Sequence, residues 1–476
     1  MKHQSKFFVA FAVLFCFVSL SIDAFAEAPW KQGQIVVQGT PADFPGYNVV
    51  KYMKHANLTV LAIQRGYEKA HVAALKANGK RVGLNRIATK FVNDPWYASD
   101  QWNFSHIQSD LAWTVTTGNG VMVAVLDSGL NPDGDDGVNV CNQGGYDFVN
   151  GDSNPMDGDG HGTHVSGTIS QNTNNNVGVA GLAYGACILP VKVLDDSGSG
   201  SFADIADGIY YAVDEGAEVI NMSLGINARY GITNDEIMDP ALDYAYNHGV
   251  TVVCASGNDG SRKNVGYPAI YPSCIAVGAT DYADNVTRYS NKGTGLDLVA
   301  PGGDTSKDLN GDGYPDGILQ ETKPAGYDWG YWFFDGTSMA SPHVAAVAAL
   351  LYAKKPAITP AEVTEALTAT CLDIEDSGFD NASAYGLVQA YDALMYIGGG
   401  GCVPTGDEIC GDGIDNNCDG QIDEGCGSCT DADGDGWCVE DGDCDDTNAQ
   451  VNPGRKEVGK FKKDGIDNDC NGIIDG

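Results

Sequence analysis

The chain has 476 residues and a formal net charge of −37, a length that suffices for two or three domains. So large a negative charge argues against nucleic acid or an anionic membrane as a partner. It suits bound Ca²⁺ or a salty habitat, and composition alone does not separate these two.

The N-terminal segment has the pattern of a secretory signal peptide. Lys2 and Lys6 precede an apolar run over residues 7–22, and the small-x-small stretch AFA ends at residue 26. The run is short for a membrane anchor, and no other segment is long and apolar enough to cross a bilayer. We therefore predict a signal peptide over residues 1–26, no transmembrane anchor, and a secreted protein that is either free or associated with the cell surface.

Cysteine usage agrees with export. The chain has fourteen cysteines, and removal of Cys16 with the signal peptide leaves thirteen. In an exported protein these cysteines predict disulfides, and an odd number leaves at least one thiol free or paired between chains.

Residues 27–92 have the pattern of a small α+β unit. The stretches at 33–39 and 57–64 are apolar enough for strands, and residues 67–79 show helical spacing that ends at Gly79.

Residues 93–397 alternate between apolar runs and helical patterns. The runs are continuous, which is typical of strands buried on both faces of a parallel sheet. We predict strands at 121–126, 187–194, 218–224, 250–256 and 274–279, and helices at 202–216 and 235–249. This order predicts an α/β fold with a doubly wound, mainly parallel sheet, whose active site lies at the carboxyl ends of the strands.

The C-terminal part differs from the rest. A glycine linker at 398–401 precedes a tail, residues 402–476, that is rich in Asp, Asn, Gly and Cys and poor in apolar residues. Such a tail cannot build a normal core and needs disulfides or metal ions to fold.

Three motifs carry the residues of a nucleophilic site. Asp127 ends a buried strand in VLDSGL, His161 lies in MDGDGHGTHVSGT, and Ser338 stands just before a helix in DGTSMASPHVAAVAALL. A serine hydroxyl becomes a good nucleophile when a histidine takes its proton, and a carboxylate orients and stabilises that histidine.

These motifs resemble those of the subtilisin-like serine proteases, in which Asp, His and Ser follow in this chain order. The stretches NVGVAGLAYGACILPVKVL, INMSLG, VVCASGNDG and VGYPAIYPSCIAVGAT match in order and spacing, and the likeness covers about residues 94–397. The resemblance implies that Ser338 is the nucleophile, His161 the general base and then acid, and Asp127 the residue that orients His161. It also implies that the Asn258 amide and the Ser338 backbone N–H form an oxyanion hole.

The resemblance further implies two peptide-binding walls and a specificity pocket. The substrate contacts are Ser223, Leu224, Gly225, Ala255, Ser256, Gly257 and, at the pocket floor, Gly266. Because a glycine floor leaves the pocket roomy, we expect a preference for large apolar or aromatic residues before the scissile bond.

The other polar residues of the histidine motif receive no catalytic role. His164 lies one turn beyond His161, and the HExxH pattern of a zinc site is absent, so we predict a buried, hydrogen-bonded histidine. Asp157 and Asp159 are interpreted as solvated loop carboxylates.

The unit at 27–92 occupies the position of the family's prodomain, which assists folding and inhibits the enzyme until it is cleaved off. The resemblance implies self-processing near residues 88–94, with the prodomain as a transient inhibitor.

Four Asp-rich loops with a glycine turn offer the oxygen ligands that Ca²⁺ prefers. The candidate ligands are Asp308, Asn310, Asp312 and Asp316 in the protease region, and Asp415, Asn417, Asp419, Asp423, Asp431, Asp433, Asp435, Asp467, Asp469, Asn471 and Asp475 in the tail. The tail resembles metal-binding repeats of secreted bacterial proteins and thrombospondin type 3 or dockerin loops. The alternatives are a disordered acidic linker, or copper or zinc bound through the cysteines, which an oxidising compartment disfavours.

The family resemblance implies a further structural Ca²⁺ site in the protease region. Its ligands would be Asp136, Asn175, Val177 and Val179, with Asp94 as an additional candidate.

Two disulfides are predicted within the protease region. Cys141–Cys187 is favoured because both residues lie near the starts of strands expected to be neighbours, and Cys254–Cys274 is a second pair. The segment at 302–335 is longer than in the simplest family members, and its aromatic cluster is expected to reshape the leaving-group side of the cleft.

Together these features predict a secreted serine endopeptidase that is stabilised by Ca²⁺, self-processed from a precursor, and active on protein or peptide substrates. One alternative is a calcium-binding adhesion protein, whose tail binds the cell surface or matrix and whose protease serves processing. Another is acyl transfer from esters on the same triad.

Overall fold

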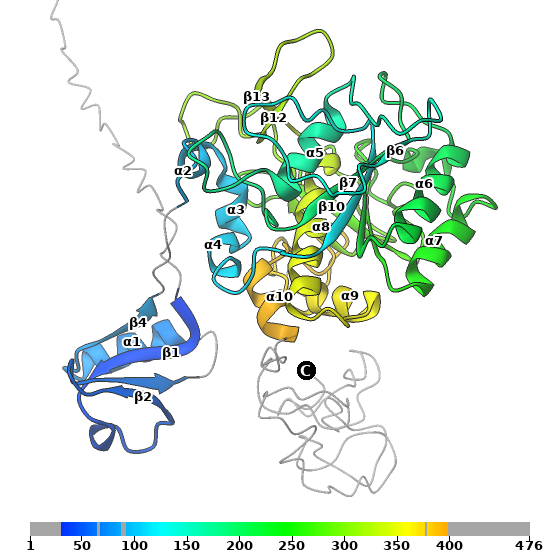
Figure 1. The fold of residues 1–476 in the computed structure, drawn as a ribbon. Coiled ribbons are helices and arrows are strands. Elements are labelled where there is room, and N and C mark those ends of the chain that lie inside the picture. Colours follow the sequence, from blue (N-terminus) through cyan, green and yellow to red (C-terminus); the bar gives the residue numbers. More distant parts are fainter. Residues whose placement is uncertain (1–29, 64–66, 87–91, 377, 398–476) are drawn as a thin grey trace, which may run out of the picture. The chain divides into compact units, whose positions relative to one another are not determined.

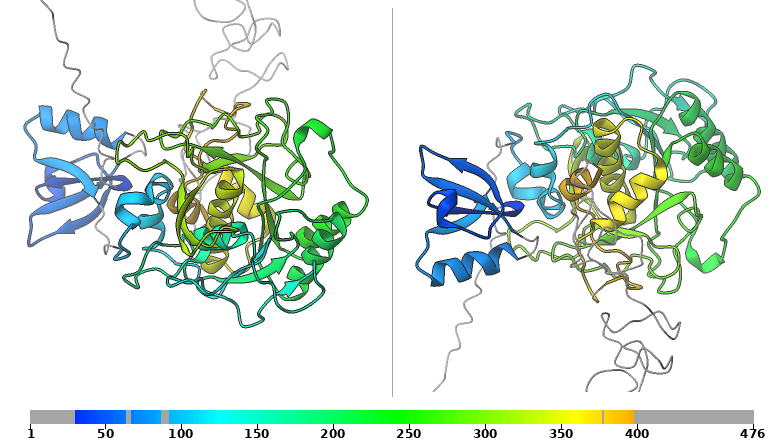
Figure 2. Two further views of the ribbon diagram at one scale, coloured as in Figure 1. Left: turned by 90° about the horizontal axis from the view of Figure 1, so that it is seen from above. Right: turned by 90° about the horizontal axis from the view of Figure 1, so that it is seen from below.

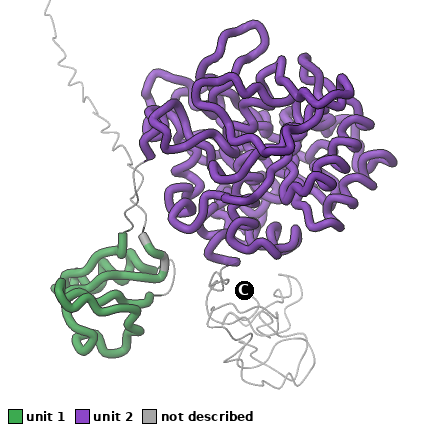
Figure 3. Tube along the Cα trace, viewed as in Figure 1, with its two compact units in different colours: residues 1–88 green, residues 89–476 purple. Residues whose placement is uncertain are grey.

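The computed structural model describes residues 30–63, 67–86, 92–376 and 378–397. The chain divides into two compact units, residues 1–88 and residues 89–476 (Figure 3). The predicted signal peptide, glycine linker and tail lie outside the described residues.

The first unit is a four-stranded antiparallel sheet on which helix α1 packs. Its strands, in the order β2-β3-β1-β4, are β1 (Trp30–Gln38), β2 (Val49–Met53), β3 (Leu58–Ala62) and β4 (Val82–Arg86), and α1 spans Glu68–Ala77, with a 3-10 turn at Pro41–Asp43. The sequence predicted β1, β3 and α1. It missed the two edge strands, β2 and β4, of which β2 is exposed over its first three residues and β4 is fully buried only at Val82.

The second unit is built on a seven-stranded sheet in the order β11-β10-β9-β8-β5-β7-β6. Its strands are β5 (Met122–Asp127), β6 (Tyr146–Asp147), β7 (Cys187–Lys192), β8 (Val219–Met222), β9 (Thr251–Ala255), β10 (Cys274–Thr280) and β11 (Leu298–Pro301). All neighbouring pairs are parallel. Because β5 and β8 to β11 are buried along their whole length, their sequences are continuous apolar runs, and the predicted α/β fold is confirmed.

Helices cover both faces of this sheet (Figure 1, Figure 2). The helices α6 (Phe202–Asp214) and α7 (Met238–Asn247) pack together on one side, and α5 (His161–Ser170) and α8 (Thr337–Lys354) pack together on the other. The remaining helices are α2 (Tyr97–Asp100), α3 (Trp102–His106), α4 (Ser109–Ala112), η2 (Ala228–Tyr230), α9 (Pro360–Ala369) and α10 (Ala390–Ile397). Among the described residues, no helix is long and apolar enough to span a bilayer.

The winding of the sheet reverses at β5. The chain proceeds from β5 to β6 and β7 on one side, and then to β8, β9, β10 and β11 on the other. In doubly wound sheets a crevice forms at such a switch point, beyond the carboxyl ends of the strands. Here the crevice lies where β5 ends at Asp127 and where β8 ends at Met222.

An antiparallel hairpin, β12 (Ile318–Thr322) and β13 (Gly330–Phe334), precedes α8. The sequence indicated an insertion with an aromatic cluster here, but not a hairpin. The strand β12 is buried along its whole length and packs against α5. The insertion therefore supports the helix that begins with His161.

One predicted disulfide is present and the other is absent. The Cys141–Cys187 bond is confirmed, whereas Cys254 and Cys274 are buried free thiols, so that prediction is wrong. Cys254 lies opposite Ala276, which puts Cys274 two residues out of register. A rise of about 3.3 Å per residue and a strand spacing of about 4.8 Å then separate the two Cα atoms by about 8 Å, beyond disulfide reach.

Removal of the disulfide by the double substitution Cys141→Ser and Cys187→Ser is expected to destabilise the second unit. The bond joins residues 46 apart in sequence, and closure of such a loop restricts the unfolded chain by about 4 kcal/mol. Thermal unfolding measures the loss, with Cys371→Ser, a free cysteine, as the control. Equal melting temperatures for the double variant and the wild type would contradict the expectation.

Candidate active site

Asp127 and His161 form a hydrogen-bonded pair at the carboxyl end of β5. The carboxylate is fully buried, and its Oδ1 lies 2.8 Å from Nδ1 of His161. The backbone N–H of Ser128 also donates to this oxygen, at 2.7 Å. The ionised carboxylate therefore holds the tautomer of His161 that carries its proton on Nδ1 and leaves Nε2 free to accept one.

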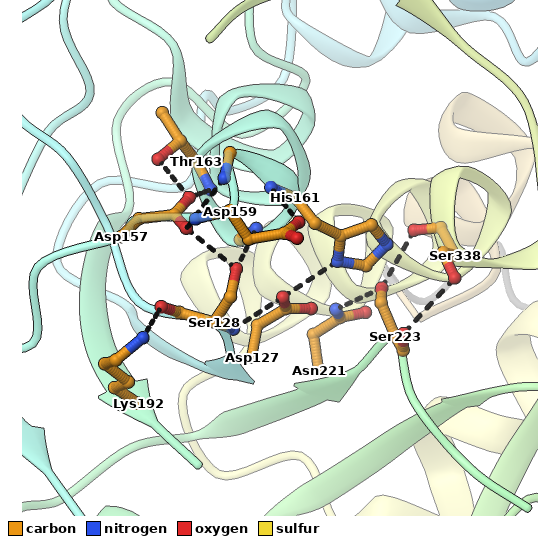
Figure 4. A network of polar contacts seen from close by, with 12 residues as sticks. Asp127, Ser128, Asp157, Asp159, His161, Thr163, Lys192, Asn221, Ser223 and Ser338 are labelled. Atoms are coloured by element: carbon orange, nitrogen blue, oxygen red, sulfur yellow. Dashed lines mark hydrogen bonds and ion pairs between the residues drawn. The ribbon is translucent and has the colours of Figure 1, made fainter. Parts of the chain in front are cut away.

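His161 is the first residue of α5, and close packing fixes this end of the helix. A Cβ atom at Gly162 would lie 2.2 Å from the carbonyl oxygen of Gly129, so only glycine permits the observed approach. The side chain of His161 remains 26% exposed and borders the crevice, and Figure 4 shows its imidazole between Asp127 and Ser338.

Asp157 organises the loop that precedes His161. It is 4% exposed, and its oxygens accept hydrogen bonds from the Ser128 hydroxyl (2.9 Å), from the Thr163 hydroxyl (2.6 Å) and from the backbone N–H groups of Asp159, Gly160 and Thr163. The interpretation of Asp157 as a solvated carboxylate is therefore wrong. The sequence around Asp157 does not indicate that its hydrogen-bond donors come from two segments, one at Ser128 and one at residues 159–163.

The protonation of His161 depends on the carboxylates around it. Burial lowers the pKa of the imidazole, but the charge and hydrogen bond of Asp127, with smaller contributions from Asp159 and Asp157, outweigh burial and raise the pKa to about 9. These carboxylates therefore stabilise the protonated form of the imidazole.

Ser338 lies in the first turn of α8, one residue inside the helix rather than just before it. Its hydroxyl donates to the carbonyl oxygen of Ser223 at 3.2 Å, and the Ser223 hydroxyl donates back to the carbonyl oxygen of Ser338 at 2.8 Å. Asn221 and Ser341 bond to the same Ser223 hydroxyl. This clamp ties the start of α8 to the end of β8, as Figure 4 shows for Asn221, Ser223 and Ser338, and it leaves Ser338 on the same crevice as His161.

Asn258 is held in a single orientation. Its Oδ1 accepts from the backbone N–H and from the hydroxyl of Thr337, each at 2.9 Å. Because both bonds occupy the carbonyl end, the Nδ2 group is left to face the crevice, which Asn258 lines beside Ser338. This geometry fits a donor to a developing oxyanion.

The crevice is a cavity of about 690 Å³. Six of the seven predicted substrate contacts line it, namely Ser223, Leu224, Gly225, Ala255, Gly257 and Gly266. Ser256 does not, because it is fully buried and its hydroxyl donates to the carbonyl oxygen of Asn291. A Cβ at Gly266 would lie 2.5 Å from the carbonyl oxygen of Ile226, so the backbone approach at this position requires glycine.

Several residues of the cavity were not predicted. They include Leu194, Phe202, Ile205 and Tyr267, which add apolar surface, and Asp159, which adds a carboxylate. They come from separate loops and helices, so their convergence leaves no pattern in the linear sequence.

His164 serves as a packing residue, as predicted. It is fully buried, its Nε2 lies 2.9 Å from the carbonyl oxygen of Ile318 and 3.1 Å from that of Trp332, and its ring stacks on Phe334 at 4.4 Å. Burial lowers its pKa to about 3, so it is neutral at working pH and attaches α5 to the hairpin.

The predicted calcium loop near residue 175 gathers around two buried carboxylates. Asp94 accepts from the N–H groups of Asn174 and Asn175, and Asp136 accepts from Nδ2 of Asn175 (2.7 Å) and from the N–H of Val179 (2.9 Å). Burial raises the pKa of Asp136 to about 6, despite these hydrogen bonds. Val177 also lies in this loop, and its N–H donates to Oδ1 of Asn175. The two buried carboxylates offer oxygen ligands of the kind that Ca²⁺ prefers, while the amide groups that contact them are N–H donors.

The loop at 308–316 contains a further buried carboxylate. Asp316 is 2% exposed, one oxygen accepts from the N–H of Leu309, and Oδ1 has no partner among the described residues. Asp308, Asn310 and Asp312 lie on the exposed part of the loop and bond to its backbone. Within the described residues no three His, Cys, Asp or Glu side chains converge as a ready metal site, so amide and backbone oxygens would have to complete either shell.

Comparison with known proteins identifies the family. The subtilase family model (Peptidase S8) matches residues 118–386. A thermophilic serine proteinase of Bacillus sp. (strain AK1) is 41% identical over 308 residues, which cover 64% of this chain and 69% of that protein. Thermitase of Thermoactinomyces vulgaris is 39% identical over 304 residues, which cover 64% of this chain and 99% of that protein.

A solved structure agrees with this assignment. The structure of a protease from Pseudoalteromonas arctica PAMC 21717 superposes with a TM-score of 0.57 and 32% sequence identity, covering 64% of this chain and 99% of that one. The chain therefore belongs to the subtilase family. The matched residues, 118–386, lie within its second unit, and the protein is a subtilisin-like serine endopeptidase.

A further family model, a metal-binding motif of the copper-binding MopE type, matches residues 402–424 and 443–476. The matched residues include eight of the eleven predicted tail ligands. The other three, Asp431, Asp433 and Asp435, lie between the two matched stretches. All eleven lie outside the described residues. The match supports metal binding by the tail and leaves the ion open.

The pH dependence of catalysis follows from the charges around His161. An imidazolium cannot accept the serine proton, so kcat/KM is expected to rise from pH 7 toward pH 10 through an ionisation near the pKa of about 9. A pH–rate profile with a neutral peptide substrate measures this limb. A profile already flat at pH 7 would show that the three carboxylates do not stabilise the imidazolium.

Proposed function

We propose that this protein is a secreted endopeptidase that cleaves peptide bonds through an acyl-enzyme on Ser338. The observation that carries the proposal is the buried Asp127–His161 pair beside Ser338, at the switch point of the sheet. His161 Nε2 takes the hydroxyl proton as Ser338 Oγ bonds to the substrate carbonyl carbon. The same proton passes to the leaving amine as the peptide C–N bond breaks, and water then releases the acyl group by the reverse sequence.

The charge that develops on the substrate carbonyl oxygen would be met by two donors. These are Nδ2 of Asn258 and the backbone N–H of Ser338, and Thr337 holds the first in place through Oδ1. Extended substrate would lie between the segments at 223–225 and 255–257, with the residue before the scissile bond above Gly266. The open floor favours large apolar or aromatic side chains there.

Hydrolysis of casein, together with labelling by a serine-reactive phosphonate, tests this function. The wild type should do both, and Ser338→Ala should do neither. If the wild type neither hydrolyses casein nor takes up the label, the proposal fails, and the alternative of an adhesion protein remains.

We also propose that the chain is made as a precursor with a signal peptide over residues 1–26 and a prodomain over residues 27–92. The first unit folds as a separate compact body, as a cleavable folding module and transient inhibitor would. Secretion and self-cleavage near residues 88–94 follow from this organisation.

The Ser338→Ala variant, expressed in a host that lacks other proteases, is expected to stay joined to its N-terminal unit. Self-processing requires the hydroxyl of Ser338 as nucleophile, whereas folding of the chain does not require this hydroxyl. The intact mass of the purified protein distinguishes the two forms. A Ser338→Ala protein with the same N-terminus as the wild type would refute self-processing.

We propose that Ca²⁺ binds the loops around Asp136 and Asp316 and stabilises the protease unit. The supporting observations are the buried carboxylates, since a buried charge without a cation is costly and a divalent ion would offset that cost. At Asp316 the bound ion would also hold the start of β12, and thereby the hairpin that packs on α5.

Substitution Asp316→Asn is expected to shrink the difference in melting temperature between Ca²⁺ and EGTA solutions. The asparagine amide is a poorer Ca²⁺ ligand than the carboxylate. In the absence of Ca²⁺ the substitution also removes a buried carboxylate whose pKa is raised by burial. The exposed Asp328→Asn on the same hairpin is the matched control and should keep the wild-type difference. An identical response to EGTA in both variants would contradict a site at Asp316.

A further inference from the structure

Lys192 is a buried cation beside the strand that ends with Asp127. It is the last residue of β7 and pairs in register with Asp127, the last residue of β5. Its side chain is 3% exposed. The transfer of an ammonium group out of water is costly unless well-formed bonds compensate for it. The bonds of this ammonium group therefore indicate what its burial supports.

The ammonium group of Lys192 makes two bonds of different kinds. One is an ion pair with Asp196 at 2.9 Å, and the side chain of Asp196 is 68% exposed. Such a pair contributes little to stability because water screens it. The other is a hydrogen bond to the carbonyl oxygen of Ser128 at 2.7 Å, which Figure 4 shows. Within the part of the chain that the structure describes, no other group donates to this carbonyl. The burial of Lys192 thus supports Ser128.

Ser128 connects the two segments that carry Asp127 and His161. It is fully buried, and its backbone N–H donates to Oδ1 of Asp127 at 2.7 Å. Its hydroxyl donates to Asp157 at 2.9 Å and accepts from the backbone N–H of Gly162, the residue after His161, also at 2.9 Å. A shift of Ser128 would therefore disturb both partners of the catalytic hydrogen bond.

The carboxylate of Asp127 depends on Ser128 for its orientation. Its Oδ1 has two partners, the N–H of Ser128 and Nδ1 of His161, whereas its buried Oδ2 has no hydrogen-bond partner among the described residues. A carboxylate that is bonded through one oxygen only is less well fixed against rotation than one bonded through both. The N–H of Ser128 is thus the described hydrogen-bond donor, apart from His161, that holds this carboxylate in place.

We propose that Lys192 is a positioning residue for the catalytic reaction. Its ammonium group anchors Ser128 through the carbonyl oxygen, Ser128 holds the carboxylate of Asp127 through its N–H, and the carboxylate aligns the imidazole of His161. Lys192 does not line the active-site cavity, so it acts on the rate of the chemical step and not on substrate binding. This inference rests on the proposed function, because it concerns the alignment of the proposed triad.

The test measures kcat for a peptide substrate in the wild type and in Lys192→Met, per active site counted by complete labelling with the serine-reactive phosphonate. Methionine keeps an unbranched buried side chain and removes the donor. We expect kcat per site to fall about tenfold with KM unchanged, because a small misplacement of a catalytic group slows the reaction. Lys192→Arg keeps a charged donor and should retain most of the wild-type kcat.

The matched control is Asp196→Asn. This substitution removes the exposed ion pair of Lys192 and leaves its bond to the carbonyl oxygen of Ser128. The Asp196→Asn variant should therefore keep the wild-type kcat. A fall in kcat as large as that in Lys192→Met would assign the effect to the ion pair and overturn the role of the Ser128 bond.

A spectroscopic measurement separates positioning from stability. The proton on Nδ1 of His161 lies in the bond to Asp127, and a proton in such a bond gives an NMR signal far downfield. This signal should shift or broaden in Lys192→Met and stay unchanged in Asp196→Asn. A lower melting temperature of Lys192→Met, with kcat per site and the proton signal both at their wild-type values, would show a structural role only and overturn the proposal.

Two further outcomes remain informative. If Lys192→Met does not fold, Lys192→Gln takes its place, because glutamine is uncharged and one bond too short to keep the contact with Ser128. Wild-type kcat and an unchanged proton signal in that variant would overturn the proposal as well. If the wild type neither hydrolyses the peptide nor binds the phosphonate, the proposed function fails. The proton signal would then still decide whether Lys192 aligns the Asp127–His161 pair.

Discussion

The hydrogen bond between Asp127 and His161 is the interaction on which the site depends. Asp127 is buried at the end of a central strand, so its carboxylate cannot move without disturbing β5 and its neighbours β7 and β8. His161 is fixed from the other side by the close contact of Gly162 with Gly129. The imidazole is therefore positioned by the sheet core, while Ser338 is positioned by the clamp between the end of β8 and the start of α8.

The three carboxylates near the imidazole of His161 differ in their surroundings. Asp127 is compensated by His161 and Asp157 by neutral donors, whereas Asp159 faces the cavity. The buried histidines of the two motifs behave differently from His161. Burial lowers the pKa of His164 to about 3 and that of His343 to about 4, so both stay neutral and act through packing and hydrogen bonds. Of these three histidines, His161 is the one with a carboxylate partner, and it is the one whose pKa is raised.

Local patterns in the sequence were sufficient to predict much of the fold. The buried strands of the second unit are continuous apolar runs, and the motifs of Asp127, His161 and Ser338 each sit at the end of a strand or the start of a helix. The β12–β13 hairpin was missed because its strand residues also fit an irregular insertion, and its partner α5 lies far away in sequence.

The remaining errors also have long-range causes. The hydrogen-bond partners of Asp157 and the register of Cys254 against Cys274 are set by strand pairing and loop packing, which leave no local pattern. The same holds for Ser256, which lies within a predicted wall but turns its side chain toward Asn291. Tertiary placement, rather than residue type, decided each of these cases.

The central claim is that Asp127 and His161 activate Ser338. Its most direct test is the rate of phosphonate labelling between pH 6 and 10, with the adduct located by peptide mass spectrometry, in the wild type and in Asp127→Asn. We predict an adduct on Ser338 alone, a rate that rises with deprotonation of His161, and a loss of about 10³–10⁴-fold in Asp127→Asn. Labelling at another residue, or an equal rate in the Asp127→Asn variant, would contradict the account.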